Sequence, residues 1–157
     1  MKWQQLCNNS NFNDLPYKIE LNEQGQIIMS PSRLMQGAYQ SEVVKKLAEL
    51  LTDGQIITEC AIQTPKGTKV ADVAWFSYAR WQQVKDEFES LFAPEICIEI
   101  LSPSNSDYEM NMKKKLYFSG GAKEVWICKE DGTMNFYIPK GEIENSGIVP
   151  EFSKQIM

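Results

Sequence analysis

The chain of 157 residues contains no histidine. This absence excludes Ser-His-Asp and Cys-His nucleophilic catalysis, the paired-histidine helix of zinc proteases, and every catalytic zinc or iron site that needs an imidazole ligand. Any chemistry must therefore come from carboxylates, Lys, Tyr, Cys or Ser, or from a metal ion held by oxygen atoms.

Cysteine is scarce as well, and no two of the four cysteines form a C-x-x-C pair of the kind that binds zinc. Three of them, Cys60, Cys97 and Cys128, lie inside apolar runs, where a free cysteine behaves as a small hydrophobic residue. Cys7 lies in a polar N-terminal segment that lacks the apolar core of a signal peptide. We therefore expect four free thiols and a cytoplasmic location.

Long apolar runs are missing too, since none approaches the roughly 18 residues that span a bilayer, so no membrane partner is expected. Sixteen Lys and Arg face 21 Asp and Glu, for a formal charge of −5. This balance argues against a general nucleic-acid coat or a membrane-surface binder. It leaves a metal-dependent nuclease open, because a bound cation reverses the local sign of the charge.

The periodicity of the apolar residues predicts one α/β (α+β) domain, a mixed β-sheet flanked by α-helices, over residues 17–138. An N-terminal arm (1–16) is predicted to be loose, and a C-terminal tail (139–157) shows little periodicity. Within the domain the pattern predicts a hairpin over 17–29, helices over 36–51, 78–90 and 109–118, and strands over 55–63, 70–76, 95–101, 123–128 and 133–138.

Two acidic residues lie inside apolar strands: Asp72 in VADVAWF and Glu99 in ICIEIL. Burying an unpaired carboxylate costs roughly several kcal/mol. A bound divalent cation commonly offsets that cost. The alternating pattern around Glu99 also fits a half-exposed strand whose glutamate lies in water, and that alternative stays open at this point.

A longer pattern follows Glu99. It consists of E-I-L-S-P-S over 99–104, K-x-x-x-Y over 113–117, Gly121-Ala122, and E-V-W over 124–126. With Asp72 before it, and with Gly37, Gln40 and Glu42 at the start of the first helix, this pattern resembles the bacterial putative restriction endonuclease family of the PD-(D/E)XK nuclease superfamily. The resemblance covers about residues 17–138.

The resemblance implies a restriction-endonuclease-like fold and the hydrolysis of phosphodiester bonds in DNA with Mg²⁺, or with Mn²⁺ in its place. Asp72 and Glu99 would be catalytic metal ligands, and Glu42 would complete the metal shell. Glu42 could equally be a surface residue that pairs with Lys46. Two close carboxylates repel each other, so replacing Asp72 or Glu99 by alanine is expected to leave the fold intact or more stable.

The chain departs from the pattern at three positions. Ala71 replaces the proline before Asp72, Gln36 lies where a histidine is frequent, and Leu101 lies where the superfamily has its lysine. The family is thought to take its lysine from the following helix, so Lys113 becomes the catalytic candidate. Other lysines remain open for this role, namely Lys114, Lys115, Lys66 and Lys69, and Gln63 is a weak candidate to polarise the attacking water.

Two rival functions remain. A catalytically inactive module with the nuclease fold could bind DNA or protein, and an interaction protein could simply carry solvated acidic strands. Cutting both strands of a duplex calls for two sites, which makes a homodimer plausible, although no residue points to one.

Overall fold

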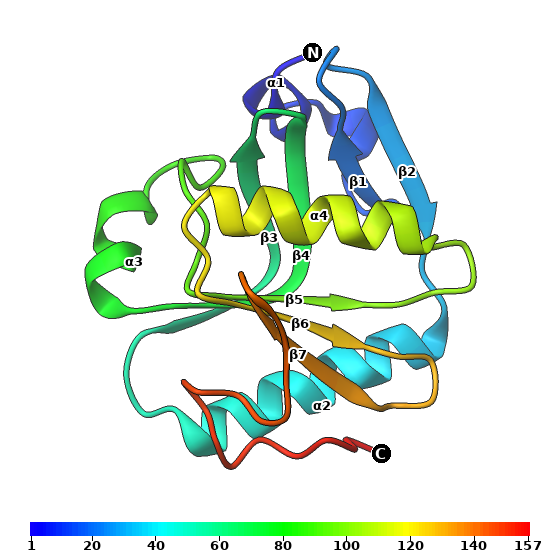
Figure 1. Cartoon of the computed structure of the whole chain (residues 1–157). Helices are drawn as coiled ribbons and strands as arrows, with labels where there is room; N and C mark the ends of the chain where they lie inside the picture. The colour runs from blue at the N-terminus through cyan, green and yellow to red at the C-terminus, as the bar shows by residue number, and fades with distance from the viewer.

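The computed structural model describes all 157 residues and contains a two-stranded and a six-stranded sheet. Figure 1 shows helix α4 on one side of the large sheet and helix α2 on the other. The elements are α1 (Trp3–Cys7), the 3₁₀ turn η1 (Ser10–Phe12), β1 (Tyr17–Leu21), β2 (Ile27–Pro31), α2 (Leu34–Leu50), β3 (Gln55–Thr64), β4 (Gly67–Phe76), α3 (Tyr78–Val84), β5 (Ile96–Ile100), α4 (Asp107–Ser119), β6 (Glu124–Cys128), β7 (Met134–Ile138) and β8 (Gly141–Ile143).

The large sheet has the order β3-β4-β5-β6-β7-β8. Its neighbours are antiparallel except β5 and β6, which run parallel and are joined by α4. A parallel pair needs a crossover of this kind, because a tight turn can join only antiparallel strands. The mixed sheet flanked by helices, expected from the sequence, is thus confirmed.

Each face of the sheet carries its own hydrophobic core. On one face α2 buries Tyr39, Val43 and Leu47, whose spacing of four residues places them on one side of the helix. Side chains of the C-terminal tail complete this core, among them Phe152, whose ring centroid lies 4.7 Å from that of Trp126. On the other face α4 buries a row with spacings of three and four residues, which consists of Met110, Lys113 and Tyr117. A lysine is rarely buried unless it has a charged partner, so Lys113 in this row indicates a cluster of charged side chains.

Several boundaries differ from the prediction. The segment predicted to be a loose arm contains the short helix α1, which buries Leu6. The helix predicted over 78–90 ends at Val84. The tail is packed, with Val149, Phe152 and Ile156 in the core. Periodicity did not predict this packing, because the few apolar side chains of the tail follow neither a helix nor a strand period.

The tail is attached to the sheet through Glu124 at the start of β6. Its carboxylate accepts hydrogen bonds from the indole of Trp126 at 2.8 Å, the hydroxyl of Ser146 at 2.6 Å, and the amides of Gly147 and Ile148 at 2.8 and 2.9 Å. A buried carboxylate is tolerated when hydrogen bonds replace its lost hydration. The E-V-W motif is therefore a structural anchor for residues 146–148.

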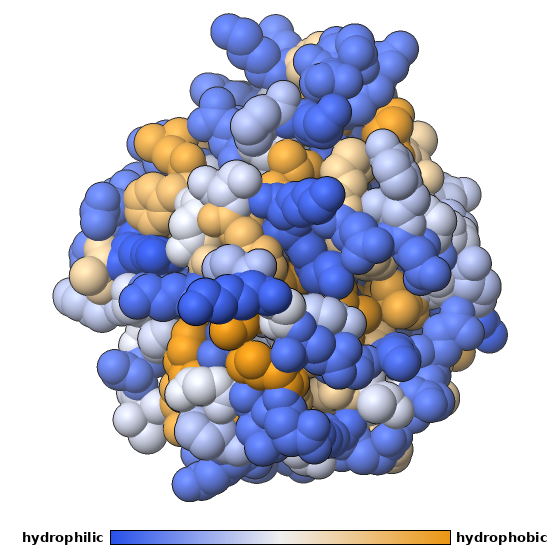
Figure 2. Space-filling model, in the orientation of Figure 1, coloured by the Kyte–Doolittle hydropathy of each residue, from blue (hydrophilic) through white to orange (hydrophobic).

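All four cysteines are free, and all but Cys7 are buried. The hydropathy of the surface is mixed, and hydrophilic residues dominate the face that Figure 2 shows. No helix combines the length and the apolar character needed to cross a bilayer.

Candidate active site

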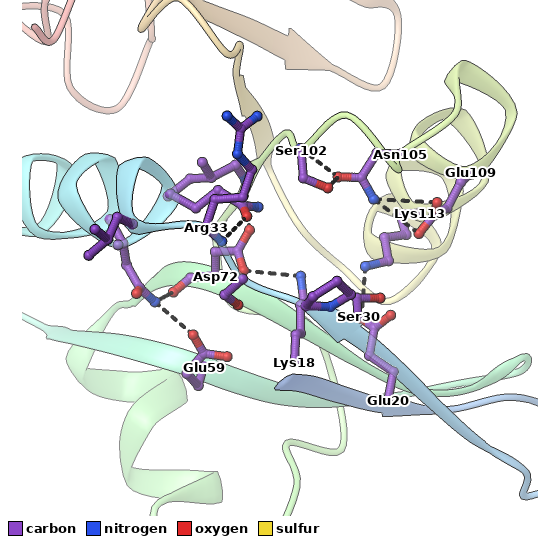
Figure 3. Close-up of a pocket in the computed structure, with 17 residues that line it drawn as sticks. Lys18, Glu20, Ser30, Arg33, Glu59, Asp72, Ser102, Asn105, Glu109 and Lys113 are labelled. Carbon is purple, nitrogen blue, oxygen red and sulfur yellow. Dashed lines mark hydrogen bonds and ion pairs between the residues drawn. The ribbon is translucent and has the colours of Figure 1, made fainter. Parts of the chain in front are cut away.

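A cavity of about 310 Å³ lies where the β1–β2 hairpin, the start of α2 and the loop before α4 meet the large sheet. Its lining is mostly charged or polar, and Figure 3 shows these side chains pointing toward one another from separate elements. The charged residues of the lining are Lys18, Glu20, Arg33, Glu59, Asp72, Glu109 and Lys113.

The cavity begins where β4 and β5 separate. The two strands pair only from Val73 to Trp75 on β4, opposite Ile96 to Ile98 on β5. Beyond this point the amide of Ile100 has no strand partner and donates instead to Asp72 Oδ2 at 2.7 Å. A backbone amide inside a protein needs an acceptor, so this bond fixes the Asp72 carboxylate at the point where the strands separate.

Strand β3 is also irregular opposite Asp72. Glu59 has a φ of 53°, a left-handed conformation that is unfavourable for a residue with a side chain. The ladder skips this position, and the side chain of Gln40 bonds both Glu59 Oε1 at 2.9 Å and the carbonyl oxygen of Asp72 at 2.7 Å. Backbone strain of this kind persists only where the surroundings impose it, and it is common at functional sites.

Lys18 of β1 bridges the two predicted carboxylates. Its Nζ lies 3.1 Å from Asp72 Oδ1 and 2.9 Å from Glu99 Oε1. Figure 3 shows the ion pair between Lys18 and Asp72 at the centre of the cavity. The remaining oxygen of Glu99, Oε2, accepts a hydrogen bond from the hydroxyl of Tyr117 at 2.7 Å.

Lys113 contacts the same Glu99 oxygen as Lys18. Its Nζ is 3.4 Å from Glu99 Oε1 and 2.8 Å from Glu20 Oε2. Glu20 also accepts the amide of Val70 at 2.7 Å, so it covers a stretch of β4 that β5 does not reach. Two lysines and three carboxylates thus form one largely buried cluster, which is held by β1, β4, β5 and α4.

The cluster separates the pKa values of the two central carboxyl groups. Burial raises the pKa of Asp72 to about 6, although Lys18 opposes this shift. Burial also acts to raise the pKa of Glu99, but Lys113, Lys18 and the Tyr117 hydroxyl outweigh it and leave that pKa below its ordinary value. Burial lowers the pKa of Lys18, but the carboxylates of Glu99, Asp72 and Glu20 reverse the effect and raise it well above normal. Glu99 is therefore ionised at neutral pH, and Lys18 is protonated.

The structure brings together the three residues predicted to be catalytic: Asp72, Glu99 and Lys113. Glu99 is only 2% exposed, which excludes the alternative of a solvated strand residue. The Glu99 carboxylate acts to raise the pKa of Asp72, as expected for two close acids, but the Lys18 ammonium contacts both carboxylates and opposes that effect. Removing either acid would therefore relieve a repulsion and also take a partner from Lys18, so the effect of the alanine variants on stability stays a prediction.

The other residues considered for metal binding or catalysis lie outside this cluster. Glu42 is half-buried on α2 and does not line the cavity, and it forms no ion pair with Lys46. Lys114 lies 3.7 Å above the ring of Tyr137. Lys66 and Lys115 are exposed, Lys69 is buried without an ion pair, and Gln63 lines a different cavity.

Sequence reasoning missed Lys18, Glu20 and the part played by Gln40. The alternation of Y-K-I-E-L in β1 places Lys18 and Glu20 on one face and Tyr17, Ile19 and Leu21 on the other. It does not show that the charged face points inward.

Asp72 and Glu99 fit a divalent cation with a shell completed by other oxygens. No group of three or more acidic or thiol side chains is arranged to hold a metal ion. Mg²⁺, however, is usually bound through one or two carboxylates together with water and substrate phosphate. Asp72 Oδ1 and Glu99 Oε1 are directed at one cationic centre, Lys18 Nζ, so a metal ion would take that position once the ammonium left.

Comparison with known proteins identifies the family of the chain. A family model described as Uma2, putative restriction endonuclease, matches residues 4–152, which is nearly the whole chain. The chain belongs to the Uma2 family. The family assignment agrees with the motif from Asp72 to Trp126, and the model also includes most of the N-terminal arm and of the tail.

A solved structure shows the same fold. The crystal structure of a putative nuclease belonging to DUF820 from Anabaena variabilis superposes with a TM-score of 0.73 at 21% sequence identity. The similarity covers 88% of this chain and 87% of that one. No match was found among curated proteins. The family is thus one described as putative restriction endonucleases, and the fold is shared with a structure described as a putative nuclease.

Proposed function

We propose that this Uma2 protein is a Mg²⁺-dependent endonuclease that hydrolyses phosphodiester bonds in DNA. One observation carries the proposal: Asp72 Oδ1 and Glu99 Oε1 are directed at a single cation position, with Lys113 Nζ 3.4 Å from the same Glu99 oxygen. Family membership supports the reaction class. Mn²⁺ is expected to replace Mg²⁺, because both are bound by carboxylate and water oxygens.

Asp72 and Glu99 would hold the metal ion through one oxygen each. A bound metal ion supplies a water of lowered pKa and neutralises charge on the phosphoryl oxygens. The second oxygens of the two carboxylates are engaged by the Ile100 amide and the Tyr117 hydroxyl, which fixes the direction of the first. This preorganisation is what a ligand set needs to bind a cation in one geometry.

Lys113 would act on the attacking water or on the negatively charged phosphoryl group. Its ammonium is held by Glu20 and Glu99 on the inner wall of the cavity, and the side chain is only 4% exposed. A cation fixed in advance near developing negative charge stabilises a transition state without reorganisation. Arg33, which also lines the cavity, is suited to contact a flanking phosphate.

The test is cleavage of supercoiled plasmid DNA in Mg²⁺ by the purified chain and by matched variants. Glu99→Gln and Lys113→Met should each lower the rate by about 10³-fold or more, as expected when an electrostatic contact to the transition state is lost. Lys114→Met is the matched control, because it removes a neighbouring lysine that lies on Tyr137 outside the cavity. Wild-type rates in the Glu99 variant would refute the proposed site.

One observation favours a second function, a module that binds DNA without cleaving it. A lysine of the chain itself already occupies the point where the metal ion would be bound. DNA binding that persists in Mg²⁺ or Mn²⁺ without any cleavage, under conditions where metal binding is demonstrated, would support this alternative.

A further inference from the structure

Lys18 is bound by the same oxygen atoms that a metal ion would need. Its Nζ lies 2.9 Å from Glu99 Oε1 and 3.1 Å from Asp72 Oδ1. The other oxygen of each carboxylate is already taken, Asp72 Oδ2 by the Ile100 amide and Glu99 Oε2 by Tyr117. An incoming cation therefore finds no pair of unoccupied carboxylate oxygens.

The two cations cannot share this position. Mg²⁺ binds oxygen at about 2.1 Å, so an ion bound by Oδ1 and Oε1 would overlap with the ammonium group or lie in contact with it. Like charges at such a distance repel strongly in a buried site. Lys18 and a divalent ion are therefore alternative occupants of one position.

Lys18 has stabilising partners in the metal-free protein, and the adjoining cavity offers space for its side chain after displacement. Without a metal ion its ammonium contacts both carboxylates and offsets part of the cost of holding two acids close together in a largely buried site. Its side chain also lines the cavity of about 310 Å³, which has room for the displaced ammonium group. The lysine is long and unbranched and comes from the separate β1–β2 hairpin, so displacing it leaves the large sheet intact.

We propose that Lys18 is a tethered cation that occupies the metal position in the free protein, and that a divalent ion binds only by displacing its ammonium group into the adjoining cavity. The inference rests on the proposed function, since it assumes that Asp72 and Glu99 are the metal ligands. Metal affinity is then set by competition with a side chain of the same chain.

The first test compares Mn²⁺ binding, measured by titration calorimetry and by the loss of the free-Mn²⁺ paramagnetic resonance signal. Lys18→Met keeps much of the side-chain volume and removes the competing charge, so it should bind one Mn²⁺ at least about tenfold more tightly than wild type. Lys66→Met, which removes an exposed lysine in the β3–β4 turn, is the matched control and should bind like wild type. Equal affinity of all three proteins would overturn the inference.

The second test needs no variant of the cluster. Wild-type protein is treated briefly with an acylating reagent, with and without saturating Mg²⁺, and the modification of each lysine is measured by mass spectrometry. Lys18 should be protected without metal and should become severalfold more reactive with it, whereas the exposed Lys66 should react equally in both. Unchanged protection of Lys18 at saturating Mg²⁺ would refute displacement even if Lys18→Met failed to fold.

The two proposals fail in different ways. If wild type and Lys18→Met both bind no Mn²⁺, the metal-dependent function is wrong, and the inference falls with it. If both bind Mn²⁺ with equal affinity and wild type cleaves DNA, the function stands and only the role of Lys18 is overturned.

Discussion

Two buried glutamates on the neighbouring parallel strands β5 and β6 are stabilised in opposite ways. Glu99 near the end of β5 is 2% exposed, and Glu124 at the start of β6 is 3% exposed. Glu124 is held by four donors that carry no charge, two of them backbone amides. Glu99 is held by the ammonium groups of two lysines and by one hydroxyl.

The difference separates a structural carboxylate from one suited to chemistry. Backbone amides cannot leave without unfolding the segment that carries them, so the partners of Glu124 cannot be exchanged. An ammonium group on a flexible side chain can move away, and another cation can then take its place. Burial alone therefore does not identify a functional acid in this fold, and the nature of its partners is the better guide.

The largest expected effect is the loss of stability when Glu124, the structural carboxylate, is replaced. Glu124→Gln places an amide NH₂ against donors that need an acceptor, so it should lower the free energy of unfolding by about 3 kcal/mol. Glu99→Gln should lower it by only about 1 kcal/mol, because Lys113 keeps Glu20 and Lys18 keeps Asp72 as ion-pair partners.

Urea denaturation of both variants without metal measures these values. The ranking should reverse for activity, with the Glu99 variant folded but inactive. A Glu99 variant that loses more stability than the Glu124 variant would contradict the distinction between the two carboxylates.

The next effect is the pH dependence of metal binding. Burial raises the pKa of Asp72 to about 6, so below that pH the carboxyl group is protonated in the folded protein and must lose a proton before it can bind a cation. Affinity for Mn²⁺ should therefore fall about tenfold per pH unit below 6 and become level above 7. Glu99 adds nothing in this range, because its pKa is lowered.

Calorimetric titrations between pH 5 and 8 provide the measurement. Affinity that stays constant down to pH 5 would mean that Asp72 has an ordinary carboxyl pKa or does not bind the metal ion.

The smallest effect compares one hydroxyl donor from each glutamate. Tyr117→Phe removes the donor to Glu99 Oε2, and Ser146→Ala removes one donor to Glu124 Oε1. Each should cost about 1 kcal/mol of stability, the usual net value of one hydrogen bond. Only Tyr117→Phe should also weaken Mn²⁺ binding, because it releases the orientation of a metal ligand. An equal change in metal affinity in both variants would remove this distinction.

Much of the fold could be predicted from local patterns. The helix that buries Tyr39, Val43 and Leu47 was visible as a period of four, and most of the strands were visible as alternating or continuous apolar runs. The observed ends of the helices and strands differ from the predicted ends by a few residues. The hydrogen bonds that end an element cannot be predicted from the spacing of apolar residues. The packed tail could not be seen at all, since its apolar residues have no regular spacing.

For the site, the sequence by itself identified the two acidic residues that lie inside apolar strands. Asp72 and Glu99 interrupt apolar strands, and the motif that continues to Lys113 indicated which lysine belongs with them. Asp72 and Lys113 are 41 positions apart, and the three residues lie on two successive strands of one sheet and on the crossover helix that follows, so sequence order limited where they could meet.

Only the tertiary structure decided what surrounds them. Lys18 reaches Glu99 across 81 positions, and Glu20 reaches Lys113 across 93. Alternation along β1 shows that its two faces differ, but which face turns inward depends on how the hairpin packs against β4. That packing covers the backbone amide of Val70, which β5 does not reach, and it brings a lysine and a glutamate into the cluster. The partners of the two acids, and with them the proposed competition for the metal position, follow from that contact.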